Sequence, residues 1–310
     1  MNSIRIKQVD AFTRKPFTGN PAGVVLEADK LTADQMQKIA NEMNLSETVF
    51  VLQPSIEDLA DLRLRWFTPN CEVDLCGHAT IAAFHALAEN GYFGLEVDED
   101  QTFMVETRSG ILTVDVEWKD MIPYVKFSLP IPEFFPFPDD ITVLCGALGL
   151  SEIELSKKAK PQITRDGYCF VPVRDNDSLQ SLDPNMELLK KMYEHHQITA
   201  FAVVTTDTGE QDLDWHMRFF APALGVNEDP VTGSANGPMA VYLLHNGLLD
   251  QEKKYFTFSA SQGESLGRPG LVTVNMTVKD GVPDEVQIAG QAVTVLDGVL
   301  TLSTQIPEKL

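Results

Sequence analysis

The sequence of 310 residues predicts an α+β protein made of two similar, pseudo-symmetric lobes, each built around a central apolar helix. Two observations lead to this fold class. The stretch 65–91 recurs at 218–247 with the same order of residue types, and each copy runs into an apolar segment of helical length. A second pair follows each copy, because 103–114 is echoed by 256–274. Strand-like alternation of apolar and polar residues surrounds both pairs, as expected for mixed β-sheet.

The first half of the chain contains two predicted helices and six predicted strands. A helix is expected over 31–44, since Leu31, Met36 and Ile39 share one face and Thr32 can serve as N-cap. Residues 79–90 predict a second helix that is apolar on nearly every side, which indicates burial. Alternating or apolar runs bounded by turn residues predict strands at 4–12, 22–28, 47–54, 62–69, 103–118 and 125–130.

A proline-rich stretch, "LPIPEFFPFPDD", occupies residues 129–140. We expect it to be extended and to connect the two lobes. Mixed α and β signals resume beyond it. The predicted N-terminal lobe comprises 1–125 plus 286–310, and the predicted C-terminal lobe comprises 126–285.

The repeat also predicts where a functional site lies. Both copies open with Arg, an aromatic residue, Phe, one further residue and Pro. Both then pass through an acidic loop to a glycine, Gly77 or Gly233, and both end in Asn-Gly at the same distance from that glycine. Because pockets commonly form between related lobes, we expect the site in the interlobe cleft.

Each copy places a glycine and a polar residue at the start of its apolar helix, Gly77-His78 in one and Gly233-Ser234 in the other. A helix N-terminus has unpaired N–H groups and a partial positive charge, so two of them could hold a carboxylate or an enolate-like oxygen. The structural alternative is that Ser234 is only an N-cap and Gly77 only a turn residue. The paired occurrence favours function.

Two carboxylates are candidates for chemistry. Asp229 precedes a proline in the loop that leads to Gly233, and Glu72 and Asp74 occupy the corresponding loop of the first copy. Glu47 opens a predicted core strand, where a charged side chain usually points to solvent. If Glu47 faces an apolar cleft instead, desolvation raises its pKa toward neutrality, where a carboxyl group can both give and take a proton.

Composition excludes several classes of protein. With 24 Lys and Arg against 45 Asp and Glu, the net charge is -21, which disfavours nucleic-acid and membrane-surface partners. No apolar signal segment opens the chain, so we expect a cytoplasmic protein with reduced thiols. Cys71 and Cys76 have no downstream pair with zinc-ligand spacing, and we predict no metal site.

The motifs "FTGNPAGVV", "LSETVFV", "FTPNCEVDLCGHAT" and "EDPVTGSANGP", in this order, resemble those of the PhzF-like (phenazine biosynthesis-like) family. That family belongs to the diaminopimelate epimerase and proline racemase superfamily, and the resemblance covers essentially the whole chain. It implies two lobes, each a β-barrel-like sheet wrapped round a central helix. It also implies isomerisation of a small anionic, amino-acid-like substrate without metal or organic cofactor, and a homodimer.

The resemblance further assigns roles to residues. The family's acid/base glutamate falls on Glu47, assisted by His78 and Asp229. The residues implied to line the substrate site are Asn20, Gly77, Gly233 and Ser234.

Relatives that racemise amino acids use two opposed cysteines. Here the first position holds Cys76, but the second holds Thr232, whose hydroxyl is too weakly acidic to act as a base near pH 7. We therefore expect one-base proton transfer by Glu47, with Cys76 as a small buried residue, and we read His85 as a packing residue. Two alternatives stay open, a Cys76-dependent racemase and a non-catalytic binding or scaffold protein with a retained pocket.

Overall fold

The computed structural model describes residues 3–55, 58–95 and 99–302. The chain forms two compact units. The first unit consists of Met1–Phe17, Pro21–Phe127 and Gly290–Leu310, and the second of Thr18–Asn20 and Ser128–Ala289. The three residues Thr18–Asn20 therefore belong to the second unit although they are early in the chain.

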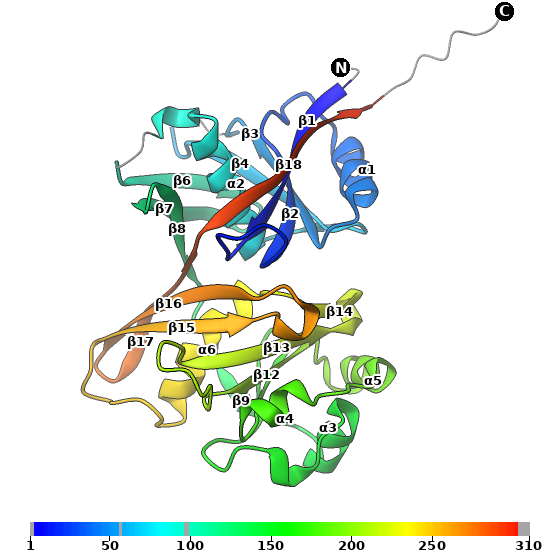
Figure 1. Cartoon of the computed structure of the whole chain (residues 1–310), viewed down its shortest axis with the longest axis vertical. Coiled ribbons are helices and arrows are strands. Elements are labelled where there is room, and N and C mark those ends of the chain that lie inside the picture. The colour runs from blue at the N-terminus through cyan, green and yellow to red at the C-terminus, as the bar shows by residue number, and fades with distance from the viewer. Residues whose placement is uncertain (1–2, 56–57, 96–98, 303–310) are drawn as a thin grey trace, which may run out of the picture. The chain divides into compact units, whose positions relative to one another are not determined.

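The first unit is a mixed sheet with two long helices (Figure 1). Its strands pair in the order β18–β1–β2–β3–β4–β6–β7–β8, with the short β5 beside β4. The pairs β2–β3 and β4–β6 are parallel, whereas β18–β1, β3–β4, β6–β7 and β7–β8 are antiparallel. The strands are β1 Ser3–Ala11, β2 Asn20–Val25, β3 Glu47–Leu52, β4 Leu62–Phe67, β5 Glu72–Val73, β6 Gln101–Thr107, β7 Gly110–Lys119, β8 Ile122–Leu129 and β18 Ala292–Thr301.

The second unit repeats this topology. Its order is β9–β10–β11–β12–β13–β15–β16–β17, with β14 beside β13. The parallel pairs, β11–β12 and β13–β15, fall at the same places as in the first unit. The strands are β9 Phe134–Pro136, β10 Gln162–Thr164, β11 Tyr168–Pro172, β12 Ala200–Thr205, β13 Trp215–Ala221, β14 Val226–Asp229, β15 Tyr255–Gln262, β16 Gly270–Lys279 and β17 Val282–Gly290.

The predicted central helices are present. α2 (Gly77–Glu89) and α6 (Gly233–His245) each have 13 residues, and nearly all of their side chains are buried. Both are capped at the C-terminus by an asparagine, Asn90 or Asn246, whose amide donates to the carbonyl four residues earlier. The glycine that follows each asparagine has a positive φ, which explains the repeated Asn-Gly.

The remaining helices cover the sheets. In the first unit, α1 (Ala33–Met43) begins at the predicted N-cap Thr32, which forms a capping box with Gln35, and buries Met36, Ile39 and Ala40. In the second unit, α3 (Ile141–Leu148), α4 (Asn176–Gln180) and α5 (Met186–His196) contribute to a hydrophobic core shared with β11–β13. Within the described ranges, no helix combines the length and apolarity required to cross a membrane.

The proline-rich segment is more than an extended connection. Phe134–Pro136 forms β9, which pairs antiparallel with β10 and takes the place that β18 has in the first unit. Phe134 packs against Phe170 and Tyr242 with ring centroids 5.4 Å apart in both cases. The segment is extended, as expected, and strand pairing and ring packing also give it a place in the sheet of the second unit.

Candidate active site

The two central helices begin in the same way. Cys76 is the N-cap of α2 and Thr232 is the N-cap of α6, and neither side chain makes a capping hydrogen bond to its helix. His78 and Ser234 are the second residues of these helices. The reading of Ser234 as an N-cap is therefore wrong, because the extended residue that precedes the helix is Thr232. Both helix starts can still offer backbone N–H groups to an anion.

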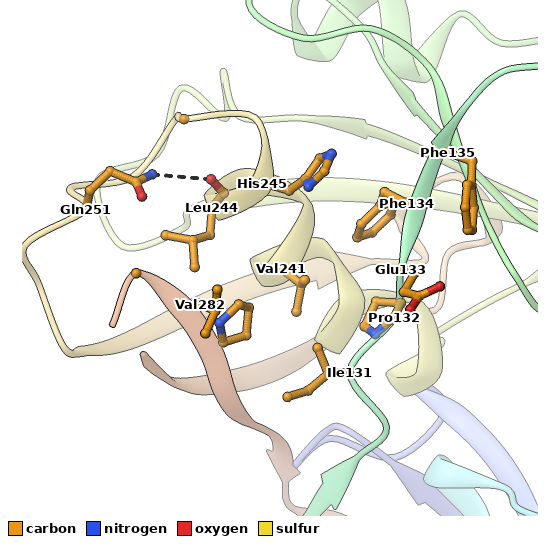
Figure 2. Close-up of a pocket in the computed structure, with 13 residues that line it drawn as sticks. Ile131, Pro132, Glu133, Phe134, Phe135, Val241, Leu244, His245, Gln251 and Val282 are labelled. Carbon is orange, nitrogen blue, oxygen red and sulfur yellow. Dashed lines mark hydrogen bonds between the residues drawn. The ribbon is translucent and has the colours of Figure 1, made fainter. Parts of the chain in front are cut away.

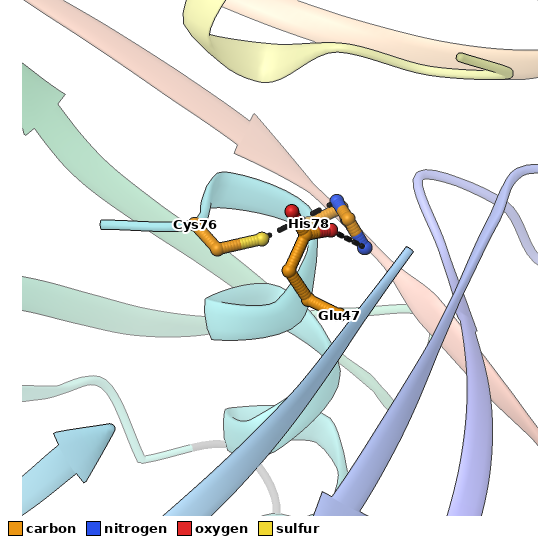
Figure 3. Close-up of side chains that lie close together, drawn as sticks. All are labelled: Glu47, Cys76 and His78. Carbon is orange, nitrogen blue, oxygen red and sulfur yellow. Dashed lines mark hydrogen bonds and ion pairs between the residues drawn. The ribbon is translucent and has the colours of Figure 1, made fainter. Parts of the chain in front are cut away.

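At the start of α2, three chemically active side chains meet (Figure 3). Glu47 opens β3, and its Oε2 lies 3.4 Å from Nε2 of His78. On the other side of the ring, Nδ1 of His78 lies 3.5 Å from Sγ of Cys76. The Glu47 side chain is only 19% exposed, so this carboxylate does not point freely to solvent.

Burial controls the charge of His78. Its side chain is 7% exposed, and desolvation lowers the pKa of the imidazole to about 3. The ring is therefore neutral at pH 7 and can give a hydrogen bond from one nitrogen while accepting at the other. The contact between Nε2 and Glu47 lacks hydrogen-bond geometry, and this nitrogen has no hydrogen bond within the described part of the chain.

The second unit holds the other predicted carboxylate. Asp229 ends β14 and accepts hydrogen bonds from Nδ2 of Asn20 at 2.9 Å and from Oγ1 of Thr232. Desolvation nevertheless raises the pKa of Asp229 to about 6, against the lowering effect of those two bonds. Asn20 is fully buried, and its Nδ2 also donates to the Val231 carbonyl at 2.8 Å.

A buried polar network supports this loop. Gln262 donates to the Asp229 carbonyl and to Oγ1 of Thr232, and its own Oε1 accepts from the Thr232 amide. Asn236 donates to the same Oε1 and accepts from the indole of Trp215 at 2.8 Å. These bonds hold the Asp229 loop against the first turn of α6, and the sequence pattern contained no signal for Gln262 or Asn236.

The two units differ where the chemistry is expected. Glu47 and Ala200 are the first residues of equivalent strands, β3 and β12, so the second unit has no counterpart of the Glu47 carboxylate. Ser234 lies instead 3.4 Å from the hydroxyl of Tyr168, the first residue of β11. Both units therefore share the same kind of helix start, whereas the glutamate is present in the first unit and is replaced by Ala200 in the second.

Glutamates of the acidic loops are structural. The repeated arginines bind them in two parallel hydrogen bonds, Arg65 to Glu72 at 2.7 and 2.8 Å and Arg218 to Glu228 at 2.8 and 2.9 Å. Residue spacing then aligns Asp229 with Val73 and not with Glu72 or Asp74. The shared arginine of the two copies was the sequence signal for this pairing.

His85 lies inside α2, buried, with Nε2 3.4 Å from the Glu89 carboxylate. Glu89 in turn accepts from Lys7 at 3.0 Å. This cluster ties α2 to β1 and agrees with the reading of His85 as a packing residue.

A pocket of about 610 Å³ in the second unit lies apart from all these residues (Figure 2). It is formed by β9 and the residues before it, the end of α6 and the turn before β17. None of the predicted site residues lines it. Its size alone does not make it the active site, because it holds neither helix start.

Comparison with known proteins places the fold and its chemistry in one class, the isomerases. An uncharacterised isomerase of Clostridium acetobutylicum is 39% identical over 96% of this chain and 97% of its own length. The trans-2,3-dihydro-3-hydroxyanthranilate isomerase of Pseudomonas chlororaphis is 32% identical over 95% of this chain and 98% of its own. The crystal structure of the PhzF-family phenazine biosynthesis protein of Bacillus anthracis matches with a TM-score of 0.87 at 32% identity, covering 97% of this chain and 100% of that one.

The model of the family described as phenazine biosynthesis-like protein matches residues 9–298. The chain belongs to this PhzF family and is an isomerase. The family and fold predicted from the sequence are thereby confirmed.

Proposed function

We propose that this isomerase moves a proton on a small, carboxylate-bearing, amino-acid-like substrate, with Glu47 as the general acid and base. The observation that carries the proposal is the contact between Glu47 and His78 at the start of α2, where a mostly buried carboxylate lies beside a buried imidazole. Glu47 removes a proton from a substrate carbon and returns it to another carbon on the same face, so no external acid or oxidant is consumed.

The other residues hold the substrate in this proposal. His78 orients Glu47 and the substrate, and Asp229 and Ser234 bind its polar groups together with Asn20. The backbone at Gly77 and Gly233 binds the carboxylate, since helix N-termini attract anions even in a protein of net charge -21. We propose, as the duplicated sequence suggested, that groups of both units contact the same substrate in an interlobe cleft.

A one-base route is favoured by the differences between the repeats. Ala200 and Thr232 stand where the first unit has Glu47 and Cys76, so neither a second carboxylate nor a second thiol is available at the equivalent positions. Cys76 is accordingly left outside the proton transfer.

The substrate class follows from the relatives. The Pseudomonas chlororaphis relative is named for trans-2,3-dihydro-3-hydroxyanthranilate, a cyclic amino acid. We propose a substrate of this chemical class, and we keep the homodimer and the cytoplasmic location as predictions.

The test is proton exchange in deuterated buffer, followed by NMR with trans-2,3-dihydro-3-hydroxyanthranilate as the probe. We expect the wild-type protein to incorporate deuterium and Glu47→Gln to lose at least about a thousandfold in rate, within the range of general acid-base catalysis plus charge removal. Glu42→Gln is the matched control, because Glu42 is exposed on α1 and undergoes the same chemical change. Exchange in Glu47→Gln at the wild-type rate would refute the proposal.

The same assay separates the alternatives. Probe binding without any exchange in the wild-type protein would favour a binding or scaffold protein. Cys76→Ala should keep exchange within about tenfold of wild type, and a loss as severe as that of Glu47→Gln would favour the Cys76-dependent racemase.

A further inference from the structure

Cys76 carries a thiol, a group that can bind metal ions, and it has no part in the proposed proton transfer. Its sulfur nevertheless lies next to the His78 ring, and the ring lies next to Glu47 (Figure 3). One donor atom from each of the three residues lies within 4.8 Å of the other two. A thiol, an imidazole and a carboxylate are the three ligand types that zinc takes in proteins.

The spacing of each neighbouring pair of donors fits a tetrahedral ion. With Zn–S of about 2.3 Å and Zn–N of about 2.0 Å, tetrahedral angles separate sulfur from nitrogen by about 3.5 Å. The Sγ of Cys76 and Nδ1 of His78 are 3.5 Å apart. The same reasoning gives about 3.4 Å for an oxygen and a nitrogen ligand, and Glu47 Oε2 lies 3.4 Å from Nε2 of His78. One ion can bond only one of the two ring nitrogens, so each of these distances describes one neighbouring pair of donors. The third donor lies within 4.8 Å and has to move closer when the ion binds.

A second observation points to a ligand at this place. Nε2 of His78 is buried and has no hydrogen bond among the residues described, although the side chain is only 7% exposed. Buried polar atoms are normally satisfied, and the few exceptions call for an explanation. An ion bound at Nε2, on the side of the ring that faces Glu47, would supply the missing interaction.

We infer that Glu47, Cys76 and His78 bind one zinc ion, and that bound zinc blocks proton transfer by occupying Glu47. The inhibition rests on the proposed function, whereas the binding does not. Zinc displaces the thiol proton to solvent and leaves a fourth position for water. Magnesium and calcium prefer all-oxygen ligands and should not compete.

The repeat provides an internal contrast. The equivalent positions in the second unit are Ala200, Thr232 and Ser234, which offer no carboxylate, thiol or imidazole. The inference therefore predicts one ion per chain and not two.

Binding is tested directly with Co²⁺, which takes the same ligands as zinc and is visible by absorption. The full-length, metal-free and reduced protein is titrated with Co²⁺ in the absence of oxygen. We expect a thiolate-to-cobalt charge-transfer band and strong visible bands of tetrahedral cobalt, saturating at one equivalent. Zn²⁺ should abolish these bands and Mg²⁺ should not.

Variants assign the ligands. Cys76→Ser should remove the charge-transfer band, and Glu47→Gln should weaken Co²⁺ binding at least about tenfold. Cys71→Ser is the matched control and should bind like wild type, because Cys71 is the exposed thiol while Cys145 and Cys169 lie in a hydrophobic core. A missing band in the wild type, or a band that Cys71→Ser loses and Cys76→Ser keeps, would overturn the inference.

The inhibition is tested by adding Zn²⁺ to the deuterium-exchange assay. We expect exchange by wild type and by Cys71→Ser to stop at one equivalent of Zn²⁺. Exchange that continues while the cobalt titration shows a filled site overturns the inhibitory half. If no protein shows exchange but the cobalt bands appear, the proposed function fails and zinc binding stands.

Discussion

The guanidinium of Arg218 holds the carboxylate of Glu228 through two parallel hydrogen bonds of 2.8 and 2.9 Å, with both side chains nearly buried. The same guanidinium donates to the carbonyls of Leu179 and Leu182, so it also ties α4 to the sheet. Arg65 and Glu72 form the same pair in the first unit. In each unit the pair joins a long strand, β4 or β13, to the short strand that precedes the central helix, β5 or β14.

Removing one partner of the second pair should be costly. We expect Arg218→Met to lower the free energy of unfolding by about 3–5 kcal/mol, because Glu228 stays buried without its counter-charge. Urea unfolding at pH 7 measures this. The double variant Arg218→Met, Glu228→Leu should recover most of the loss, and Arg165→Met, in an exposed pair with Glu133, should change little. A double variant as unstable as the single one would contradict the argument.

Asp229 should make stability depend on pH in the direction opposite to most carboxylates. Its pKa is raised to about 6 in the folded protein, so the folded state holds the proton more tightly than the unfolded state. This stabilisation is complete below about pH 4 and is lost as the pH rises through 6. We compare the free energy of unfolding of the wild type with that of Asp229→Asn. Between pH 4 and 7 the wild type should lose on the order of 2 kcal/mol relative to the variant.

The difference is measured by urea unfolding of both proteins at several pH values, since other carboxylates cancel in the comparison. A carboxyl carbon resonance of Asp229 that titrates near pH 6 would support the assignment directly. A resonance that titrates below pH 4, or a flat difference, would show that the two hydrogen bonds outweigh desolvation.

Gln262 should be required for the loop that carries Asp229. Gln262→Leu removes the partners of the Thr232 amide, the Asn236 amide and the Asp229 carbonyl, all inside the protein. We expect a loss of roughly 3 kcal/mol in unfolding free energy and slower deuterium exchange. Gln251→Leu is the control, because its amide makes a single bond of 3.3 Å to Leu244 outside this network. Equal effects of the two substitutions would argue against a special role for the network.

Gly263 should not tolerate a side chain. Its φ is +99°, and a Cβ there would lie 2.3 Å from the Arg268 carbonyl oxygen and 2.7 Å from that of Pro230. Both are backbone atoms and cannot move aside cheaply, so Gly263→Ala should cost more than about 2 kcal/mol. Gly267 also has a positive φ but open space around it, so Gly267→Ala should cost about 1 kcal/mol. Thermal unfolding of both variants checks the contrast, and equal losses would mean that φ alone matters.

Several features could be read from sequence because their signals are local or repeated. The all-round apolar runs behind Gly77 and Gly233 predicted central helices, and their common spacing predicted two related units. The contrast between Cys76 and Thr232 is visible in the sequence alone, and it indicates that a two-thiol mechanism is incomplete. Local signals could not show that the extended proline-rich segment contains a strand, since Phe134–Pro136 forms β9 by pairing with β10.

The sequence by itself determined the duplicated architecture, the two helix starts and the family. Only the tertiary structure decided which way each side chain points. The register of β3 beside β2 and the burial of α2 bring Glu47 to His78, although either face of the strand was open to it. The amide of Asn20 donates a hydrogen bond to Asp229, although the two residues are 209 positions apart in the sequence. Such contacts depend on strand register and helix packing, which arise from the whole fold and leave no local pattern in the residues that make them.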